Sequence, residues 1–143
     1  LDHYFLTAEP AEAAMLDAGI EVPGWTRTGM AFKASLRGTG VGTSACRFAG
    51  TPGVGPSSHF YTVDAAECAK VRSDPLWTFE EFAFAVEPAG IGVCPEGRVP
   101  VTRLYNDGKD GQANHRYLTS RSETARMRDE RWIVEGPVFC SLP

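Results

Sequence analysis

Short hydrophobic and aromatic segments recur along the chain, and each is bounded by Gly, Pro, Asn or Asp. Three of them start with a histidine and read HYFLT, HFYT and HRYLT, at His3, His59 and His115. Three more start with a tryptophan, at Trp25, Trp77 and Trp132. Aromatic and β-branched residues between turn formers are typical of short strands. The pattern therefore predicts a strand at each of these six segments.

The spacing of these segments indicates an internal threefold repeat. The intervals between successive histidines are both 56 residues, and a phenylalanine follows each tryptophan by seven positions, at Phe32, Phe84 and Phe139. Arg47 and Arg103 each lie twelve residues before a histidine, in two further strand-like segments. We therefore divide one domain, residues 1–143, into repeat 1 (1–44), repeat 2 (45–98) and repeat 3 (99–143).

A short helix is predicted between the histidine and tryptophan segments of every repeat. Asp64 with Glu67, and Ser120 with Glu123, have the spacing of a capping box. In repeat 1, Pro10 suits the first helical position and Gly19 the left-handed stop. Each repeat therefore reads strand, strand, helix, strand.

Repeat 1 lacks one part of this pattern. The equivalent of the Arg47 strand would lie before the numbering begins, so the opening strand of repeat 1 is missing. Three small units that cannot bury their own apolar faces must pack on one another. We therefore expect an α+β fold in which the repeats close around a pseudo-threefold axis in a β-trefoil-like way.

Composition narrows the class of protein. Hydrophobic residues make up 43% and charged residues 22% of the 143, which is typical of a folded globular chain. A net charge of −4 argues against nucleic-acid binding, and no apolar run is long enough for membrane insertion. The chain opens on Leu1 rather than Met, which indicates a processed product or a module of a larger parent protein with other domains.

The four cysteines form an even set without CxxC spacing, at Cys46, Cys68, Cys94 and Cys140. Two disulfides are the natural interpretation and favour an oxidising compartment; the alternative is four reduced, buried thiols. Cys68 and Cys94 belong to one repeat, so we predict the pairs Cys68–Cys94 and Cys46–Cys140.

The runs TRLYNDGKDGQANHRYLT, CRFAGTPGVGPSSHFYTVDAAEC and WIVEG carry a family resemblance. They are similar to an extracellular repeat family of unknown function whose units read YRLYN, HFYT, a short helix and W-x-x-EG. The resemblance implies a bacterial or fungal secreted or cell-surface protein, often multimodular, without established catalytic residues. This chain departs from that pattern at Thr28, Ala49 and Glu81.

Catalytic motifs are missing from the sequence. It contains no GxSxG, HExxH, P-loop or complete GxGxxG pattern, so we expect neither an enzyme nor a cofactor. Three histidines meeting at the axis would make a zinc site. The alternative, that each histidine hydrogen-bonds within its own repeat, is the one we favour, so no metal is expected.

The repeated tryptophans are the main candidates for function. A sugar presents an apolar C–H face to an indole, and a nearby carboxylate accepts hydrogen bonds from its hydroxyls. We therefore predict a secreted, monomeric, non-catalytic module that binds polysaccharide or cell-wall glycan. The predicted ligand-binding residues are Trp77, Glu80, Trp132, Glu135, Trp25, His59, His115 and His3.

Two alternatives stay open. In the first, the tryptophans are buried packing residues that recur because the core itself repeats. The chain is then a structural or adhesive, protein-binding repeat of a larger secreted protein. A hydrolase with an unrecognised site is the weakest alternative.

Overall fold

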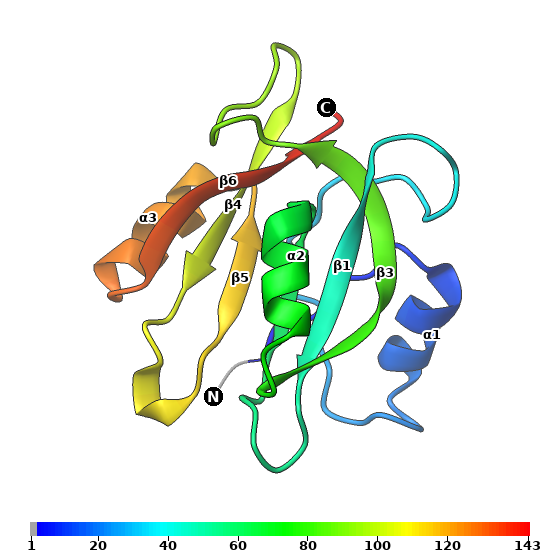
Figure 1. Ribbon diagram of the computed structural model, residues 1–143, viewed down its shortest axis with the longest axis vertical. Helices are drawn as coiled ribbons and strands as arrows, with labels where there is room; N and C mark the ends of the chain where they lie inside the picture. Colours follow the sequence, from blue (N-terminus) through cyan, green and yellow to red (C-terminus); the bar gives the residue numbers. More distant parts are fainter. Residues whose placement is uncertain (1–2) are drawn as a thin grey trace.

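The computed structural model describes residues 3–143 (Figure 1). Three α-helices, a short 3-10 helix and six strands follow one another along the chain. In order they are α1 (Pro10–Ala18), β1 (Thr43–Gly50), β2 (His59–Thr62), α2 (Ala65–Arg72), β3 (Trp77–Pro88), β4 (Val99–Tyr105), η1 (Lys109–Gly111), β5 (His115–Leu118), α3 (Arg121–Asp129) and β6 (Ile133–Ser141). The predicted α+β class is confirmed.

The six strands form one antiparallel, curled sheet in the order β2-β1-β3-β6-β4-β5. β1 lies between β2 and β3 in repeat 2, and β4 lies between β5 and β6 in repeat 3. The two halves join where Glu87 pairs with Cys140 and Pro88 with Phe139. Repeats 2 and 3 are thus built alike, with the arginine-bearing strand in the centre of each.

Repeat 1 differs from the other two. The strands predicted at His3 and Trp25 do not form; residues 3–9 and 25–32 belong to no strand. Two isolated bridges tie the end of repeat 1 to the sheet, Ser35 to Ala85 and Lys33 to Leu142. The physical reason is that no central strand lies between these segments to supply hydrogen-bond partners.

The helix ends follow the predicted caps. The side chains of Asp64 and Ser120 accept hydrogen bonds from the backbone N–H of Glu67 and Glu123, at 2.6 and 3.2 Å. Pro10 begins α1, and Gly19 ends it in the left-handed region with φ of 61°. These boundaries were predictable because caps depend on neighbouring residues alone.

The core is centred on the three repeated phenylalanines. Phe84 and Phe139 are buried and Phe32 is half-buried, and their ring centroids lie 5.7, 5.8 and 6.3 Å apart. Two smaller apolar clusters lie beneath α2 and α3, around Phe48 and Leu104 respectively. One residue from every repeat therefore meets at the centre of the fold.

The predicted disulfide pairing is wrong, although all four cysteines are paired. The bonds join Cys46 to Cys68 and Cys94 to Cys140. α2 packs over its own repeat, which brings Cys68 against β1 rather than toward the loop after β3. That loop instead lies beside β6, because β3 and β6 are neighbours in the sheet. Two disulfides indicate an oxidising environment.

Candidate functional site

The junction of repeats 1 and 2 is built around a buried arginine. The Arg47 side chain is 7% exposed and donates to both carboxylate oxygens of Glu12 on α1, each at 3.0 Å. Its Nε donates to Glu80 at 2.8 Å, and its guanidinium lies 4.7 Å from the Phe5 ring centroid. A bidentate pair, a second carboxylate and a cation–π contact together compensate the charge of Arg47.

The junction of repeats 2 and 3 repeats this arrangement. Arg103 donates to both oxygens of Glu67 at 2.9 Å and through Nε to Glu135 at 2.7 Å. Its guanidinium lies 4.8 Å from the Phe60 centroid. Each arginine therefore connects the helix of the preceding repeat to a glutamate on the last strand of its own repeat.

Two β-bulges direct these glutamates toward the arginines. Phe79 pairs with Phe48 and Glu81 with Arg47, so Glu80 between them has no partner on β1. Glu135 is likewise the extra residue between Val134 and Gly136 opposite β4. Neighbouring residues of a regular strand point to opposite faces, but the bulge lets the carboxylates of both Glu80 and Glu81 reach Arg47.

The ion pairs shift the ionisation of their members. Burial alone would raise the pKa of the Glu67 carboxyl, yet hydrogen bonds from Arg103 and Thr62, together with the charge of Arg103, outweigh it and lower the pKa. The same balance, with hydrogen bonds from Arg47 and Thr7 and the charge of Arg47 against burial, lowers the pKa of Glu12. The hydrogen bond from His59 is the main cause of the lowered pKa of Glu80. These carboxylates stay charged in the fold, where they serve as ion-pair partners.

Two of the three predicted histidines lie together. His3 Nε2 is 2.6 Å from His59 Nδ1, the two rings are stacked at 4.8 Å, and His59 Nε2 is 3.3 Å from Glu80. His115 lies at the other junction, stacked on Tyr105 at 5.0 Å and against Phe60. In repeat 3 the residue opposite His115 is Tyr105, whereas in repeat 2 the residue opposite His59 is only Ala49. His3 therefore stacks on His59 as Tyr105 stacks on His115.

The structural register of repeat 1 differs by one residue from the 56-residue spacing. The Tyr117 hydroxyl bonds to the backbone N–H and C=O of Tyr61, and the Tyr61 hydroxyl bonds to those of Leu6. Leu6 is therefore the counterpart of Tyr61, and Tyr4 rather than His3 is the counterpart of His59. The sequence did not show this one-residue offset, because His3, His59 and His115 are equally spaced although His3 is not the structural counterpart of the other two.

A third junction joins repeats 3 and 1. Arg116 stands where repeats 1 and 2 carry Phe5 and Phe60, and it donates to Glu123 at 2.8 Å. Its guanidinium lies 4.5 Å from the Tyr4 centroid. Arg116 thus supplies the cation that an opening strand supplies at the other two junctions. The sequence signal is the arginine in HRYLT, which the histidine repeat obscured.

The tryptophan and the glutamate of a predicted pair lie at different junctions between repeats. Trp77 contacts Phe60 and His115, whereas Glu80 pairs with Arg47 and His59. All three tryptophans are half-buried; Trp77 packs on the cluster around Phe48, and Trp132 on the cluster around Leu104. Each indole is therefore partly a packing element.

A hollow of about 170 Å³ borders Trp77. Its other walls come from Val54, Gly55 and Pro56 after β1, from Leu76 before β3, and from Gly111, Gln112 and Ala113 before β5. The Gln112 side-chain oxygen accepts a hydrogen bond from the Ser57 N–H at 3.0 Å. This bond orients the Gln112 amide in the lining that it shares with Trp77.

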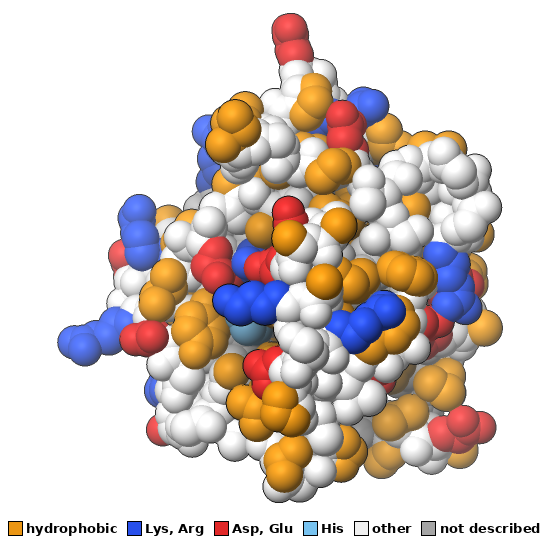
Figure 2. Space-filling view, in the orientation of Figure 1, with side chains coloured by type: hydrophobic (Ala, Val, Ile, Leu, Met, Phe, Trp, Pro, Cys, Tyr) orange, Lys and Arg blue, Asp and Glu red, His pale blue; other side chains and the backbone are white. Residues whose placement is uncertain are grey.

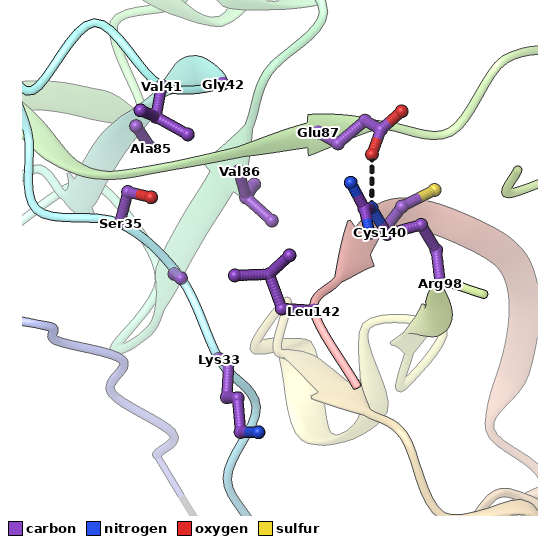
Figure 3. Close-up of a pocket in the computed structure, with 11 residues that line it drawn as sticks. Lys33, Ser35, Val41, Gly42, Ala85, Val86, Glu87, Arg98, Cys140 and Leu142 are labelled. Atoms are coloured by element: carbon purple, nitrogen blue, oxygen red, sulfur yellow. Dashed lines mark hydrogen bonds and ion pairs between the residues drawn. The ribbon is translucent and has the colours of Figure 1, made fainter.

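A second hollow, of about 330 Å³, lies where the three repeats meet (Figure 3). Val86 and Leu142 point toward each other at its centre, while Arg98 and Glu87 form an ion pair of 2.7 Å at one end. The Lys33 amine points away from them. The walls are mostly aliphatic, so this hollow offers no aromatic platform.

The face shown in Figure 2 carries acidic and basic side chains in mixture, without a continuous patch of one sign. Among residues 3–143, no group of three His, Cys, Asp or Glu side chains is arranged to hold a metal ion. Within the same residues, no helix has the length and hydrophobicity needed to cross a membrane.

Comparison with family models matches residues 1–142 to the domain of unknown function DUF5648. The chain belongs to this family. Searches of curated proteins and of solved structures found no match. Membership of a DUF5648 family of unknown function agrees with the family resemblance in the sequence, while the individual motif assignments stay predictions.

Proposed function

We propose that the protein is a non-catalytic, secreted binding module for polysaccharide or cell-wall glycan, with the hollow beside Trp77 as the binding site. The single observation that carries this proposal is a half-buried indole bordering a cavity that also contains an oriented amide. Sugar rings present C–H faces to indoles and hydroxyls to amides. In this hollow Trp77 would contact the C–H face of a sugar, and Gln112 would hydrogen-bond to a hydroxyl.

Rigid support of the hollow favours recognition. The backbone of Gly55 lies so close to the backbone of Leu76 and Thr51 that a Cβ there would lie 2.1 Å from the Leu76 oxygen. Ser58 and Asn114, both buried, are joined by a 3.1 Å hydrogen bond between the two loops. Both walls are therefore held in place before a ligand arrives, which lowers the entropic cost of binding.

The other predicted residues of this junction support the site indirectly. Glu67 and Glu135 pair with Arg103, and His115 lies against Trp77 with their ring centroids 6.4 Å apart, so His115 supports the indole. Under this proposal the direct contacts are Trp77 and Gln112. Trp25 and Trp132, with His3, His59 and Glu80, belong to the equivalent packing of the other junctions.

Affinity electrophoresis against a panel of soluble and insoluble glycans tests the proposal. The natural chain should be retarded by at least one glycan, and Gln112→Leu should abolish most of the retardation while leaving the thermal melt unchanged. Trp77→Phe should weaken binding, whereas the matched change Trp132→Phe should not. Lack of retardation by every glycan, or equal retardation of the Gln112→Leu variant, would contradict the proposal.

We also infer that the three repeats are related by an approximate threefold axis through the phenylalanine cluster. The bridges Ser35–Ala85, Glu87–Cys140 and Leu142–Lys33 join corresponding positions of successive repeats in cyclic order. A ring closed by equivalent contacts is complete within one chain, which supports a monomer.

An adhesive, protein-binding role is the second candidate. Ile91 is fully exposed at the tip of the loop between β3 and β4, and Val93 beside it is 67% exposed. Exposed apolar loop tips are typical of protein contact surfaces. An Ile91→Ser, Val93→Ser double variant that loses adhesion to a surface protein, with glycan retardation unchanged, would favour this role.

A further inference from the structure

The hollow beside Trp77 lies where the β1–β2 loop, the turn before β3 and the β4–β5 loop meet at one end of the molecule (Figure 1). Among the residues of the described chain that line it, none carries a charge. Asp74 is outside the lining and accepts a hydrogen bond from the Leu76 N–H at 2.9 Å, and Asp110 is exposed. A charged ligand group would find no opposite charge among the lining side chains, so the group that fits is neutral.

Aliphatic side chains make up much of the lining. Val54 and Leu76 are 64% and 45% exposed, and Pro56 and Ala113 border the same hollow. A plain hexose surrounds its ring with hydroxyls and gains little from such walls. A methyl group on the sugar would cover these side chains and remove their apolar surface from water. The lining therefore favours a sugar substituent that carries a methyl group.

Several oxygens of the lining are already engaged as acceptors. The backbone carbonyls of Pro56, Leu76 and Gln112 accept hydrogen bonds within the chain, at 2.9, 2.9 and 2.8 Å. The side-chain oxygen of Gln112 accepts from the Ser57 N–H, so this amide meets a ligand through its NH₂ group. The indole N–H of Trp77 is likewise a donor only. Donors in an uncharged lining favour a carbonyl oxygen as the polar group of the ligand.

Repeat 2 shows that the fold does not require an amide at position 112. The loop before β5 closes with a hydrogen bond from Asn106 N–H to the carbonyl of Asn114 at 3.0 Å. The loop before β2 closes with the equivalent bond, 56 residues earlier and also 3.0 Å long, and there Pro56 stands at the position of Gln112. Because loop closure is the same with proline, the Gln112 side chain is available for recognition.

We propose that this hollow binds the acetyl group of an acetylated glycan, with the methyl against Val54 and Leu76 and the carbonyl oxygen accepting from the Gln112 amide. Its volume of about 170 Å³ is below the ~300 Å³ of pockets that enclose a whole small ligand, so one substituent enters and the sugar ring lies outside. The inference rests on the proposed glycan function and narrows it to N-acetylated amino sugars or O-acetylated sugars, which share the acetyl group.

Three oligosaccharides of equal length and linkage test the acetyl group in isolation. Chitin, chitosan and cellulose fragments differ only in the substituent next to the anomeric carbon, which is acetamido, amino or hydroxyl. Titration calorimetry on the whole chain should show the chitin fragment binding about tenfold or more tightly than the other two. Acetylated and deacetylated xylan fragments form the second arm. A preference for acetyl in this arm alone assigns an O-acetylated sugar, and a preference in the first arm alone assigns an N-acetylated one.

Gln112→Glu then tests the amide without changing its shape. One carboxylate oxygen can still accept from the Ser57 N–H, while the other replaces the NH₂ donor and attracts the protonated amino group of chitosan. The preference for acetyl over amino should therefore fall about tenfold or more, with an unchanged thermal melt. Val54→Ser should weaken binding of the acetylated fragment, whereas Val41→Ser, a matched change at a valine that is 60% exposed, should not.

Two results would overturn acetyl recognition and leave the glycan function in place. The first is binding of plain or deacetylated fragments as tightly as acetylated ones in both arms. The second is an acetyl preference that Gln112→Glu does not change. Failure of every glycan to bind would instead contradict the glycan function itself, so the two failures are distinguishable.

Discussion

Single buried arginines connect neighbouring repeats. A guanidinium offers five N–H donors in a planar fork, so Arg103 can bind Glu67 from one repeat and Glu135 from another at once. Lysine would offer a point charge without this geometry. The junctions therefore depend on arginine at two positions that the sequence identified only by their distance from a histidine.

Replacing Arg103 by Gln should destabilise the fold strongly. Glu67 and Glu135 would keep their partly buried charges without a cation, and breaking a buried pair in this way costs about 3–5 kcal/mol. Urea unfolding of the variant measures the loss. Arg98→Gln, which removes the exposed pair with Glu87, is the matched control and should cost less than about 1 kcal/mol. Similar losses in both variants would contradict the prediction.

His115 should make the fold sensitive to mild acid. Burial, followed by the nearby Arg103, lowers the pKa of His115 from 6.5 to about 4. The unfolded chain therefore binds more protons between these values, so stability is present above pH 6.5 and lost as pH falls toward 4. Between pH 7 and 5 this one group should cost about 2 kcal/mol.

The measurement is the urea midpoint from pH 7 to 5, a window above the titration of the ion-paired carboxylates. His115→Phe keeps a ring against Tyr105 and Phe60, and should flatten part of the slope. His3, whose pKa burial and His59 lower to about 4, supplies the remaining slope. A variant with the natural slope would show that His115 is not the source.

At the scale of elements, local signals were predictive and long-range ones were not. The caps at Asp64, Ser120 and Gly19 involve residues within one helical turn, so the sequence was enough to place them. The bulges at Glu80 and Glu135 depend on the partner strand, and the cysteine pairing depends on how α2 packs. These features arise only when distant segments meet.

The Cys46–Cys68 bond should stabilise α2 on β1. Replacing both residues by Ala removes a link across 22 residues, for which the loop-entropy model gives about 3 kcal/mol. Replacing Cys94 and Cys140, 46 residues apart, should cost slightly more, about 4 kcal/mol. Thermal melts of the two double variants measure these losses, and peptide mapping without reductant should recover only these pairs.

At the scale of the whole molecule, the repeats share one centre. Phe139 is fully buried there, between Phe84 and Phe32, and its removal should cost about 3–5 kcal/mol. Phe32→Ala should cost less, because Phe32 is only half-buried and belongs to the repeat with the fewest sheet contacts. Denaturant unfolding should keep a single transition in both variants; two transitions would mean that the repeats unfold separately.

The placement of the two disulfides determines how the chain responds to mechanical force. Under tension at both termini, the stretches 47–67 and 95–139 carry no load, because a covalent bond bypasses each of them. Repeat 1 has no such bond, so it lengthens first and the body formed by repeats 2 and 3 keeps its shape. In single-molecule pulling, the oxidised protein should therefore extend by a contour length that excludes both bypassed stretches, and reductant should restore them.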